Sequence, residues 1–250
     1  MRAVIRLVFL TALRDRLFSG LAGLVLLVFG ISLFLGNAAI VETSEAGLVY
    51  ASGTMRVVLI LGLAIFVAFQ TQRLFESREI EAILSRALSR PKFILSYWLG
   101  FVGASLVLII PLLGLLFYLY GISVAITLWS ISLFLECLVV LSFAQFAALT
   151  LERATTTIFT TFAFYAFTRL IGFFLGIRDA TPDIGTNRIV NPMLDGLGLI
   201  IPRLDLMTQT RWLVYGFDAV EQAPFVMLQA VVFIVVALAA AAVDLQRKEF

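Results

Sequence analysis

The chain has 250 residues, of which 62% are hydrophobic and 14% are charged, and its formal net charge is +2. A soluble domain is close to half apolar and a quarter charged, so this composition excludes a soluble globular fold and indicates a protein that lipid surrounds. The chain has no histidine and a single cysteine, Cys137, which excludes imidazole-held haem and an internal disulfide and argues against zinc chemistry. No basic run or aromatic platform of the kind that binds nucleic acid is present.

Residues 1–16 precede the first long apolar run and have a helical pattern. Arg2 and Arg6 fall on one face, and the apolar residues on another face are Val4, Ile5, Val8, Phe9, Ala12 and Leu13. This pattern predicts an amphipathic helix that lies in the membrane interface. The alternative is an unstructured basic flank.

Six later runs are apolar enough to cross a membrane, since a spanning helix needs roughly 20 such residues. They cover about 17–36, 55–75, 93–120, 124–149, 156–177 and 224–243. A short turn at Gly121 joins the third run to the fourth. The expected fold class is therefore all-α integral membrane, with one transmembrane domain over residues 1–250.

Lysine and arginine in the short flanks predict the orientation. The N-terminal segment, the loop after the second span and the C-terminal tail are basic, whereas the first opposite loop carries Glu42 and Glu45. With six spans all three basic flanks fall on one side. We therefore expect a bacterial inner (cytoplasmic) membrane protein with both termini cytoplasmic. A cleaved signal peptide ending near Asn37 is the alternative, but the run 21–35 is better sized to span.

The segment 76–91, between the second and third spans, predicts a short cytoplasmic helix. Its apolar stripe consists of Ile80, Ile83, Leu84, Ala87 and Leu88, and the other faces carry Glu76, Arg78, Glu79, Glu81 and Arg86. Pro91 then stops the helix or bends it. Because its charges have both signs, the helix suits docking to a soluble partner better than attraction to anionic lipid.

This segment resembles the cytoplasmic helix of the permeases of type-2 ABC exporters. The matching elements are acidic residues, an Ile-Leu pair and a Ser-Arg pair: Glu76, Glu79, Glu81, Ile83, Leu84, Ser89 and Arg90. The whole layout is also similar, above all to the compact permeases of nitrous-oxide-reductase maturation and cytochrome c biogenesis. The chain departs from the family where a Gly-Thr, a proline and a Gly-Lys are usual, and has Ile80-Glu81, Ala87 and Ser96-Tyr97 there.

The resemblance implies that a separate ABC ATPase binds this coupling helix through Glu76, Glu79, Ile80, Glu81, Ile83, Leu84, Leu88, Ser89 and Arg90. It also implies a second copy or a related permease as partner, with two ATPase subunits. The chain has no phosphate-binding loop, so we expect it to bind no cofactor, with ATP and Mg held by the partner. We expect no enzyme activity in the chain itself, since no serine or cysteine has a credible base beside it.

Two charged residues lie deep in predicted spans. Glu136 is 12 residues from the outer start of the fourth span and Arg169 about eight from the outer end of the fifth, so their depths differ by about 6 Å. We predict an ion pair or a shared polar network between them. Its role is either a structural pin or a part in the substrate path, unless Arg169 snorkels outward alone. Gln145, three turns below Glu136, is expected to face the same interior.

Gly172 and Gly176 are one turn apart in the fifth span, which lets another helix approach closely. In the resembling exporters the first and fifth spans form much of the subunit contact. Here Gly23, Ser19 and Gly30 of the first span are the expected counterparts of the two glycines in the fifth. The alternative is packing within one subunit.

The outer segment 178–223 is too long for a plain connection. Three prolines punctuate it, and 193–201 and the stretch after Pro202 both favour short helices. We expect re-entrant helices that dip into the membrane and return, as in the resembling exporters; a surface loop on the outer leaflet is the alternative.

These patterns favour a permease subunit of an ABC exporter. A non-transporting membrane scaffold or assembly factor that docks a cytoplasmic partner is the alternative; a channel or secondary transporter is less favoured because no inverted repeat is evident. The spans are rich in phenylalanine and lack clusters of soft metal ligands, which favours a lipidic or amphipathic cargo over a small ion.

Overall fold

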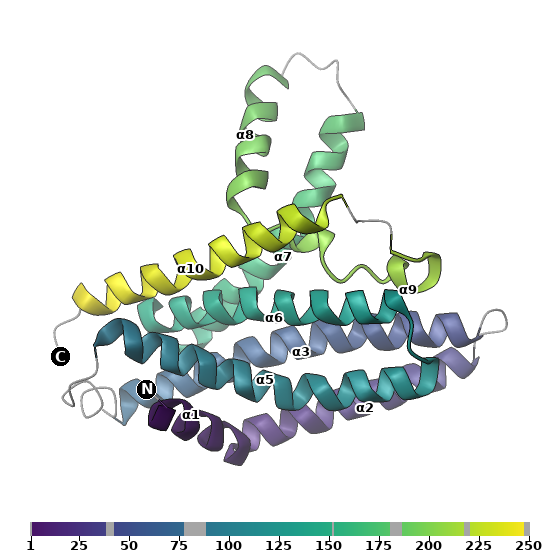
Figure 1. Ribbon diagram of the computed structural model, residues 1–250. Helices are drawn as coiled ribbons and strands as arrows, with labels where there is room; N and C mark the ends of the chain where they lie inside the picture. Colours follow the sequence, from purple (N-terminus) through teal and green to yellow (C-terminus); the bar gives the residue numbers. More distant parts are fainter. Residues whose placement is uncertain are drawn as a thin grey trace.

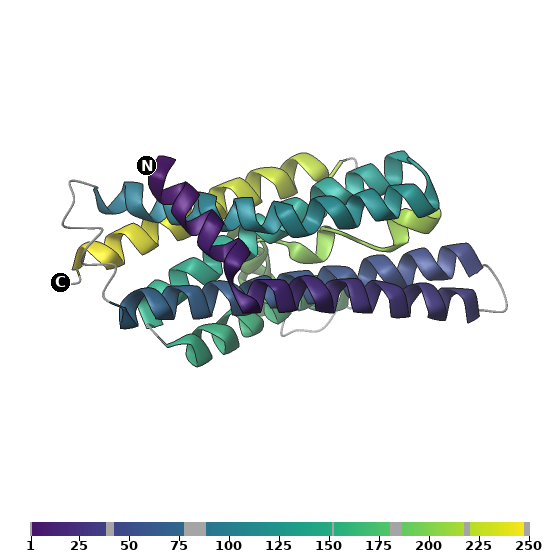
Figure 2. The same ribbon diagram turned by 90° about the horizontal axis from the view of Figure 1, so that it is seen from below.

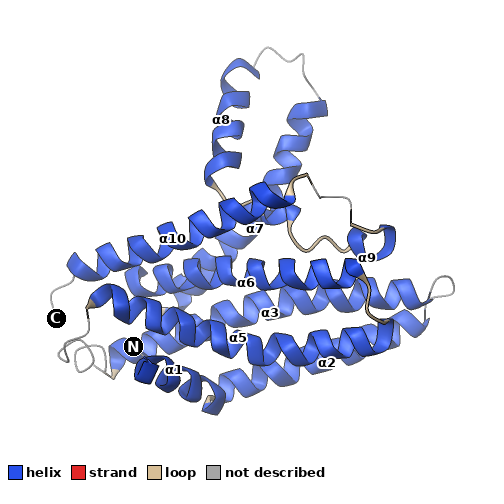
Figure 3. Cartoon of the chain, in the orientation of Figure 1, coloured by secondary structure: helices blue, strands red, loops and turns tan. Residues whose placement is uncertain are grey.

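The computed structural model describes residues 2–38, 43–77, 89–151, 153–180, 187–217 and 221–247. Every regular element within these ranges is helical (Figure 3), and six of the helices are long and apolar enough to cross a membrane. They are α2 (Arg16–Ala38), α3 (Thr43–Glu76), α5 (Arg90–Tyr120), α6 (Val124–Leu151), α7 (Ala154–Ala180) and α10 (Ala223–Arg247). The predicted class, an all-α protein that crosses the membrane several times, is confirmed.

Two spans begin earlier than the sequence analysis expected. α3 begins at Thr43 instead of near residue 55, because Leu48 and Ala51 in its first turns are buried. α5 begins at Arg90 and includes Pro91, which a first helical turn tolerates because its missing N–H has no partner there anyway.

Both ends of the segment 76–91, where the coupling helix was predicted, belong to the flanking spans or adjoin them. Glu76 is the last residue of α3, Ser89 immediately precedes α5, and Arg90 is the first residue of α5. The remaining residues predicted to contact the ATPase lie outside the described residues: Glu79, Ile80, Glu81, Ile83, Leu84 and Leu88.

The spanning helices α2, α3, α5, α6 and α10 run alongside one another, and both chain termini lie at the same end of this bundle (Figure 1). We call this end the terminal end. α3 finishes there and α5 begins there, so Ser77 and Ser89, which flank the segment 78–88, share that end with the termini. The turn at Gly121, where φ is 80°, lies at the opposite end, called the far end.

The first helix, α1 (Arg2–Arg14), lies across the bundle near its terminal end instead of along it (Figure 2). Two glycines of α5 let it approach closely. A Cβ atom at Gly100 would lie 2.6 Å from Cγ1 of Val8, and one at Gly103 would lie 3.1 Å from Cδ2 of Phe9. The orientation of α1 is the one that an interfacial helix requires.

The corner between α1 and α2 is formed by Asp15, which is buried. One carboxylate oxygen accepts the backbone N–H of Leu17 at 2.7 Å, so it caps the start of α2. The other oxygen accepts a hydrogen bond from Gln70 Nε2 at 2.7 Å and pairs with Arg73. Because Gln70 and Arg73 belong to α3, the corner is fixed to the bundle.

Next to α10, on one flank of the bundle, the last turns of α7 and the helix α8 (Asn187–Ile200) stand side by side and away from the other helices (Figure 1). The chain then returns through the 3-10 turn η1 (Leu204–Leu206) and the short helix α9 (Arg211–Tyr215) to α10. Directly after Pro202, where a second short helix was expected to begin, the structure has the 3-10 turn η1, and the short helix α9 follows it.

Candidate functional site

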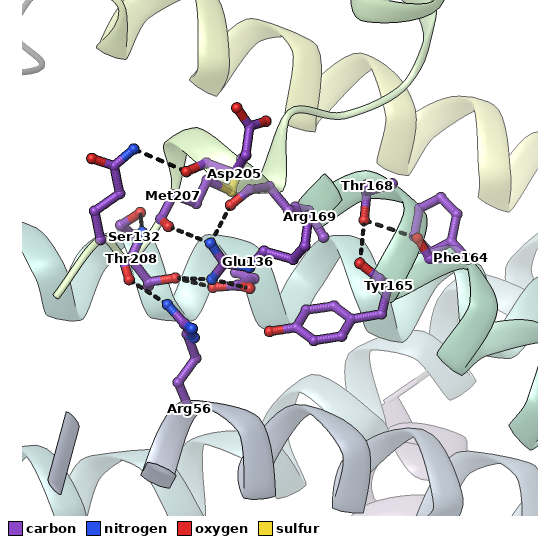
Figure 4. Close-up of polar contacts among 12 residues, drawn as sticks. Arg56, Ser132, Glu136, Phe164, Tyr165, Thr168, Arg169, Asp205, Met207 and Thr208 are labelled. Atoms are coloured by element: carbon purple, nitrogen blue, oxygen red, sulfur yellow. Dashed lines mark hydrogen bonds and ion pairs between the residues drawn. The ribbon is translucent and has the colours of Figure 1, made fainter. Parts of the chain in front are cut away.

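The candidate site is a polar network between α3, α6, α7 and the non-helical stretch around η1 (Figure 4). Arg56 lies 13 residues into α3, Glu136 12 residues into α6, and Arg169 11 residues before the end of α7. At 1.5 Å per residue, Arg56 and Glu136 are about 18–20 Å from the far ends of α3 and α6, and Arg169 contacts Glu136 at the same depth. Since the hydrocarbon core is about 30 Å thick, the network lies near the middle of the membrane.

Glu136 and Arg169 form an ion pair at the centre of this network. Arg169 Nη2 donates to Glu136 Oε1 at 2.8 Å, and the Glu136 side chain is 0% exposed. The pairing expected from their similar depths is present in the structure. A single charge at this depth costs on the order of 3 kcal/mol, and a partner of opposite sign offsets part of that cost.

Thr208 connects the ion pair to the non-helical stretch. Its hydroxyl donates to Glu136 Oε2 and accepts from Arg169 Nη2 at 2.8 Å, while its backbone N–H donates to Ser132 Oγ at 2.9 Å. Its φ of 44° lies in the left-handed region, which is rare for a threonine. This backbone conformation turns the N–H and the hydroxyl of one residue toward α6 together.

The two arginines also bind backbone carbonyls of the same stretch. Arg169 Nη1 donates to Leu204 O at 2.6 Å and to Met207 O at 2.9 Å. Arg56 Nη1 donates to Thr208 O at 2.6 Å. Non-helical backbone at membrane depth must have its polar groups satisfied by protein, and these guanidinium groups satisfy three of its carbonyls.

Gln229 of α10 holds the part of the chain just before η1. Its Nε2 lies within hydrogen-bond distance of three carbonyls, Gly198 O at 2.9 Å, Leu199 O at 3.0 Å and Ile201 O at 2.7 Å. Its Oε1 accepts the backbone N–H of Arg203 at 3.0 Å. Gln229 therefore satisfies the carboxyl end of α8, and residues 198–208, called the inserted segment below, are held by polar side chains from four spanning helices.

The glycines predicted to form a subunit contact have different surroundings. A Cβ atom at Gly172 would lie 2.3 Å from Asp205 Oδ2, so this glycine makes room for the inserted segment of the same chain. Gly176 and Gly23 face open space, with nothing within 4 Å of an added Cβ atom. The prediction of subunit packing through Gly172 is therefore corrected, because its open face is already filled by Asp205, which pairs with Arg203 at 2.7 Å.

Two arginines and one glutamate give the mid-membrane network one excess positive charge, counted over Arg56, Glu136 and Arg169. Such a site repels small cations. Its hydrogen-bond donors point at backbone carbonyls and a carboxylate. The network therefore holds irregular backbone inside the membrane. It resembles neither a nucleophile with its base nor a set of metal ligands.

The predicted polar residues at the terminal end have other partners. Glu76 accepts from Gln72 Nε2 at 2.6 Å, and Arg90 Nη1 donates to Leu245 O at 2.6 Å. Gln145 does not join Glu136: it donates to Ile94 O at 3.0 Å and so connects α6 to α5.

Four members of the site were not predicted from the sequence: Arg56, Ser132, Thr208 and Gln229. Arg56 and Gln229 had a signal, because each is a strongly polar residue close to or inside an apolar run. Ser132 and Thr208 had none, since their roles depend on where the inserted segment enters the bundle.

Comparison with protein-family models finds no matching family, and comparison with curated proteins finds no match to this chain. Its function is therefore inferred from the geometry above and from the resemblance of its sequence motifs.

Proposed function

We propose that the chain is the permease subunit of an ABC exporter in a bacterial inner membrane, with both termini cytoplasmic. It forms the membrane pathway with a second copy or a related permease, and it couples to a separate ATPase through residues 76–91. ATP and Mg bind to that ATPase, and the chain itself has no enzymatic activity. The observation that carries this proposal is a pair of hydrogen bonds that connect both ends of the coupling segment to the helices that hold the inserted segment.

The first connection joins α3 to α7. Gln72, in the last turns of α3, accepts the backbone N–H of Ala154, the first residue of α7, at 2.8 Å. α7 carries Arg169, and α3 itself carries Arg56. A displacement of the end of α3 by a bound ATPase is therefore passed to both arginines that bind the inserted segment.

The second connection joins α5 to α10. Arg90, the first residue of α5, binds the carbonyl of Leu245 near the end of α10. α10 carries Gln229, which binds the other part of the inserted segment. Both ends of the coupling segment are thus connected through continuous helices to the same inserted segment. Coupling between distant sites requires a chain of physical contacts of this kind.

The inserted segment is suited to open and close a pathway. It is held by side-chain hydrogen bonds to its backbone, and these can exchange without breaking a spanning helix. The excess positive charge beside it opposes a path for cations. The long apolar helix faces that surround it favour a lipidic or amphipathic cargo.

The test is a pull-down of the solubilised protein with candidate ABC ATPases, using the variants Glu79→Arg and Leu84→Asp. We expect the wild type to retain an ATPase and each variant to lose it. Glu221→Arg is the control, because Glu221 is exposed and precedes α10 at the far end. An ATPase that is absent from the wild type, or that both variants keep fully, contradicts the proposal.

A non-transporting scaffold remains the second candidate. The observation that favours it is that the mid-membrane network holds backbone, a structural task that needs no transport. The two candidates differ in their response to nucleotide. For a permease, ATP and vanadate with the bound ATPase change the hydrogen-exchange protection of residues 198–208, whereas a scaffold leaves it unchanged.

A further inference from the structure

We propose that the corner between α1 and α2 is a binding site for one anionic phospholipid, taken from the membrane leaflet at the terminal end of the bundle. This inference does not depend on the proposed transport function. It rests on two adjoining cavities, on the charges that line them and on the position of α1.

The two cavities share Thr11 and Arg73 as lining residues. The larger has a volume of about 500 Å³, with an apolar wall made by Leu7, Val8, Leu74, Tyr97 and Phe101 and a polar rim made by Gln70, Glu76 and Ser77. The smaller has a volume of about 400 Å³ and is lined in addition by Arg14, Asp15 and Arg16. The two cavities, together called the hollow below, have three arginines and one aspartate around the smaller and an apolar wall in the larger.

The charges around this hollow leave two arginines for a ligand. Asp15 already pairs with Arg73 and accepts from Gln70 and from the backbone of Leu17, so its negative charge is compensated. Glu76 keeps its negative charge, because its hydrogen-bond partner Gln72 is neutral, so the three arginines and two carboxylates that line the hollow leave an excess charge of +1. Within the described chain no ion pair joins Arg14 or Arg16 to an acidic residue. Both therefore remain available for a phosphate, whose oxygens match the fork of guanidinium donors.

The position of the hollow explains why the ligand is a lipid. α1 lies across the bundle (Figure 2), as a helix in the membrane interface does. A phosphate beside Arg14 and Arg16 is at the level of this helix, and the apolar wall of the larger cavity can accept the upper part of an acyl chain. A free inorganic phosphate has no apolar part that could pack against that wall. Leu7 is 51% exposed at its edge, which keeps the hollow open to lipid.

The hollow is also preformed. Gly100 and Gly103 admit α1 against α5, and the buried Asp15 fixes the corner to α3. A binding site whose walls are held in this way does not have to pay for ordering them when the ligand binds.

The experiment is native mass spectrometry of the protein released from nanodiscs of phosphatidylcholine with a minor share of phosphatidylglycerol. We expect one phosphatidylglycerol per chain to remain bound to the wild type. The double variant Arg14→Gln, Arg16→Gln should lower that occupancy about tenfold, because two charge-assisted hydrogen bonds are lost. Thr11→Trp, which places a bulky side chain at the junction of the two cavities without changing the charge, should lower it similarly.

The matched control is Arg2→Gln with Arg6→Gln, which removes the same charge at exposed positions of α1 outside the cavities. It should keep the bound lipid. If both arginine pairs lower binding equally, the lipid is only attracted by net charge and the site does not exist. Retention of lipid by Thr11→Trp, or its displacement by millimolar inorganic phosphate, would equally overturn the proposal. Size-exclusion profiles of the variants show whether each is folded.

Discussion

Asp205 fills the space that a side chain at Gly172 would need: a Cβ atom there would lie 2.3 Å from the carboxylate oxygen Oδ2. At Gly176, one turn further along α7, nothing lies within 4 Å of an added Cβ atom. Two glycines that look equivalent in the sequence therefore have different tasks. One admits the inserted segment of its own chain, and the other leaves an open surface on the helix.

This difference predicts opposite results for the same substitution. Gly172→Leu should lower the melting temperature of the detergent-solubilised protein, because Asp205 and its partner Arg203 must move; overpacking of this kind typically costs about 1–3 kcal/mol. Gly176→Leu should leave the melting temperature unchanged. Thermal unfolding followed by fluorescence checks both.

Crosslinking of the same two variants tests the subunit contact. If Gly176 faces a second copy in the membrane, Gly176→Leu should reduce dimer crosslinking without reducing stability. A loss of stability in Gly176→Leu equal to that of Gly172→Leu would contradict the distinction between the two positions.

The spanning helices were predictable from the sequence, because each needs a long apolar run and such runs are evident in the sequence. The bounds were less so. Glu45 was placed in the first loop opposite the basic flanks, but burial of Leu48 and Ala51 against the bundle extends α3 over residues 43–54. Tertiary packing decided that boundary, and the sequence pattern alone does not record it.

Glu136 balances two arginines, which makes its removal costly. Glu136→Gln leaves Arg56 and Arg169 without a carboxylate and raises the charge of the network from +1 to +2. Breaking a buried pair costs about 3–5 kcal/mol, so we expect a loss of about 3 kcal/mol in the free energy of unfolding. Steric trapping in bicelles measures it.

The charge argument is tested by adding Arg56→Met to Glu136→Gln, which returns the network to +1. We expect the double variant to be less destabilised than the sum of the two single variants. Strict additivity would show that the residues act as separate structural contacts instead of one electrostatic unit.

Gly100 determines how closely α1 can approach α5. Gly100→Val should push α1 away, since even a Cβ atom would lie 2.6 Å from Cγ1 of Val8. Hydrogen exchange of the amides of residues 2–14 should then become faster. Gly114→Val is the matched control on the same helix, because nothing lies within 4 Å of its added Cβ atom. Unchanged exchange in α1 of the Gly100 variant would mean that α1 is held elsewhere.

The ion pair of the candidate site was predictable for a simple reason: Glu136 and Arg169 are strong charges in apolar runs, and their depths can be counted. The rest of the site was not, because its other partners are backbone atoms. The carbonyls of Leu204, Met207 and Thr208 become ligands of the arginines only when the inserted segment reaches mid-membrane. Which backbone enters the bundle depends on the packing of α7 and α10.

Gln229 is the side chain that most directly tests whether the inserted segment depends on these contacts. Its amide lies within hydrogen-bond distance of three carbonyls and accepts one N–H between Gly198 and Arg203. Gln229→Leu leaves these backbone groups without a partner, and each unsatisfied buried group costs about 1–3 kcal/mol. The segment should therefore open locally while the spanning helices remain intact.

Hydrogen exchange measured by mass spectrometry checks this prediction. The amides of residues 198–208 should lose protection in Gln229→Leu, and those of α6 should keep theirs. Gln222→Leu is the matched control, since Gln222 is an exposed glutamine just before α10 and binds none of these carbonyls in the described structure. Equal effects of the two substitutions, or protection lost throughout the bundle, would mean that Gln229 stabilises α10 itself instead of holding the inserted segment.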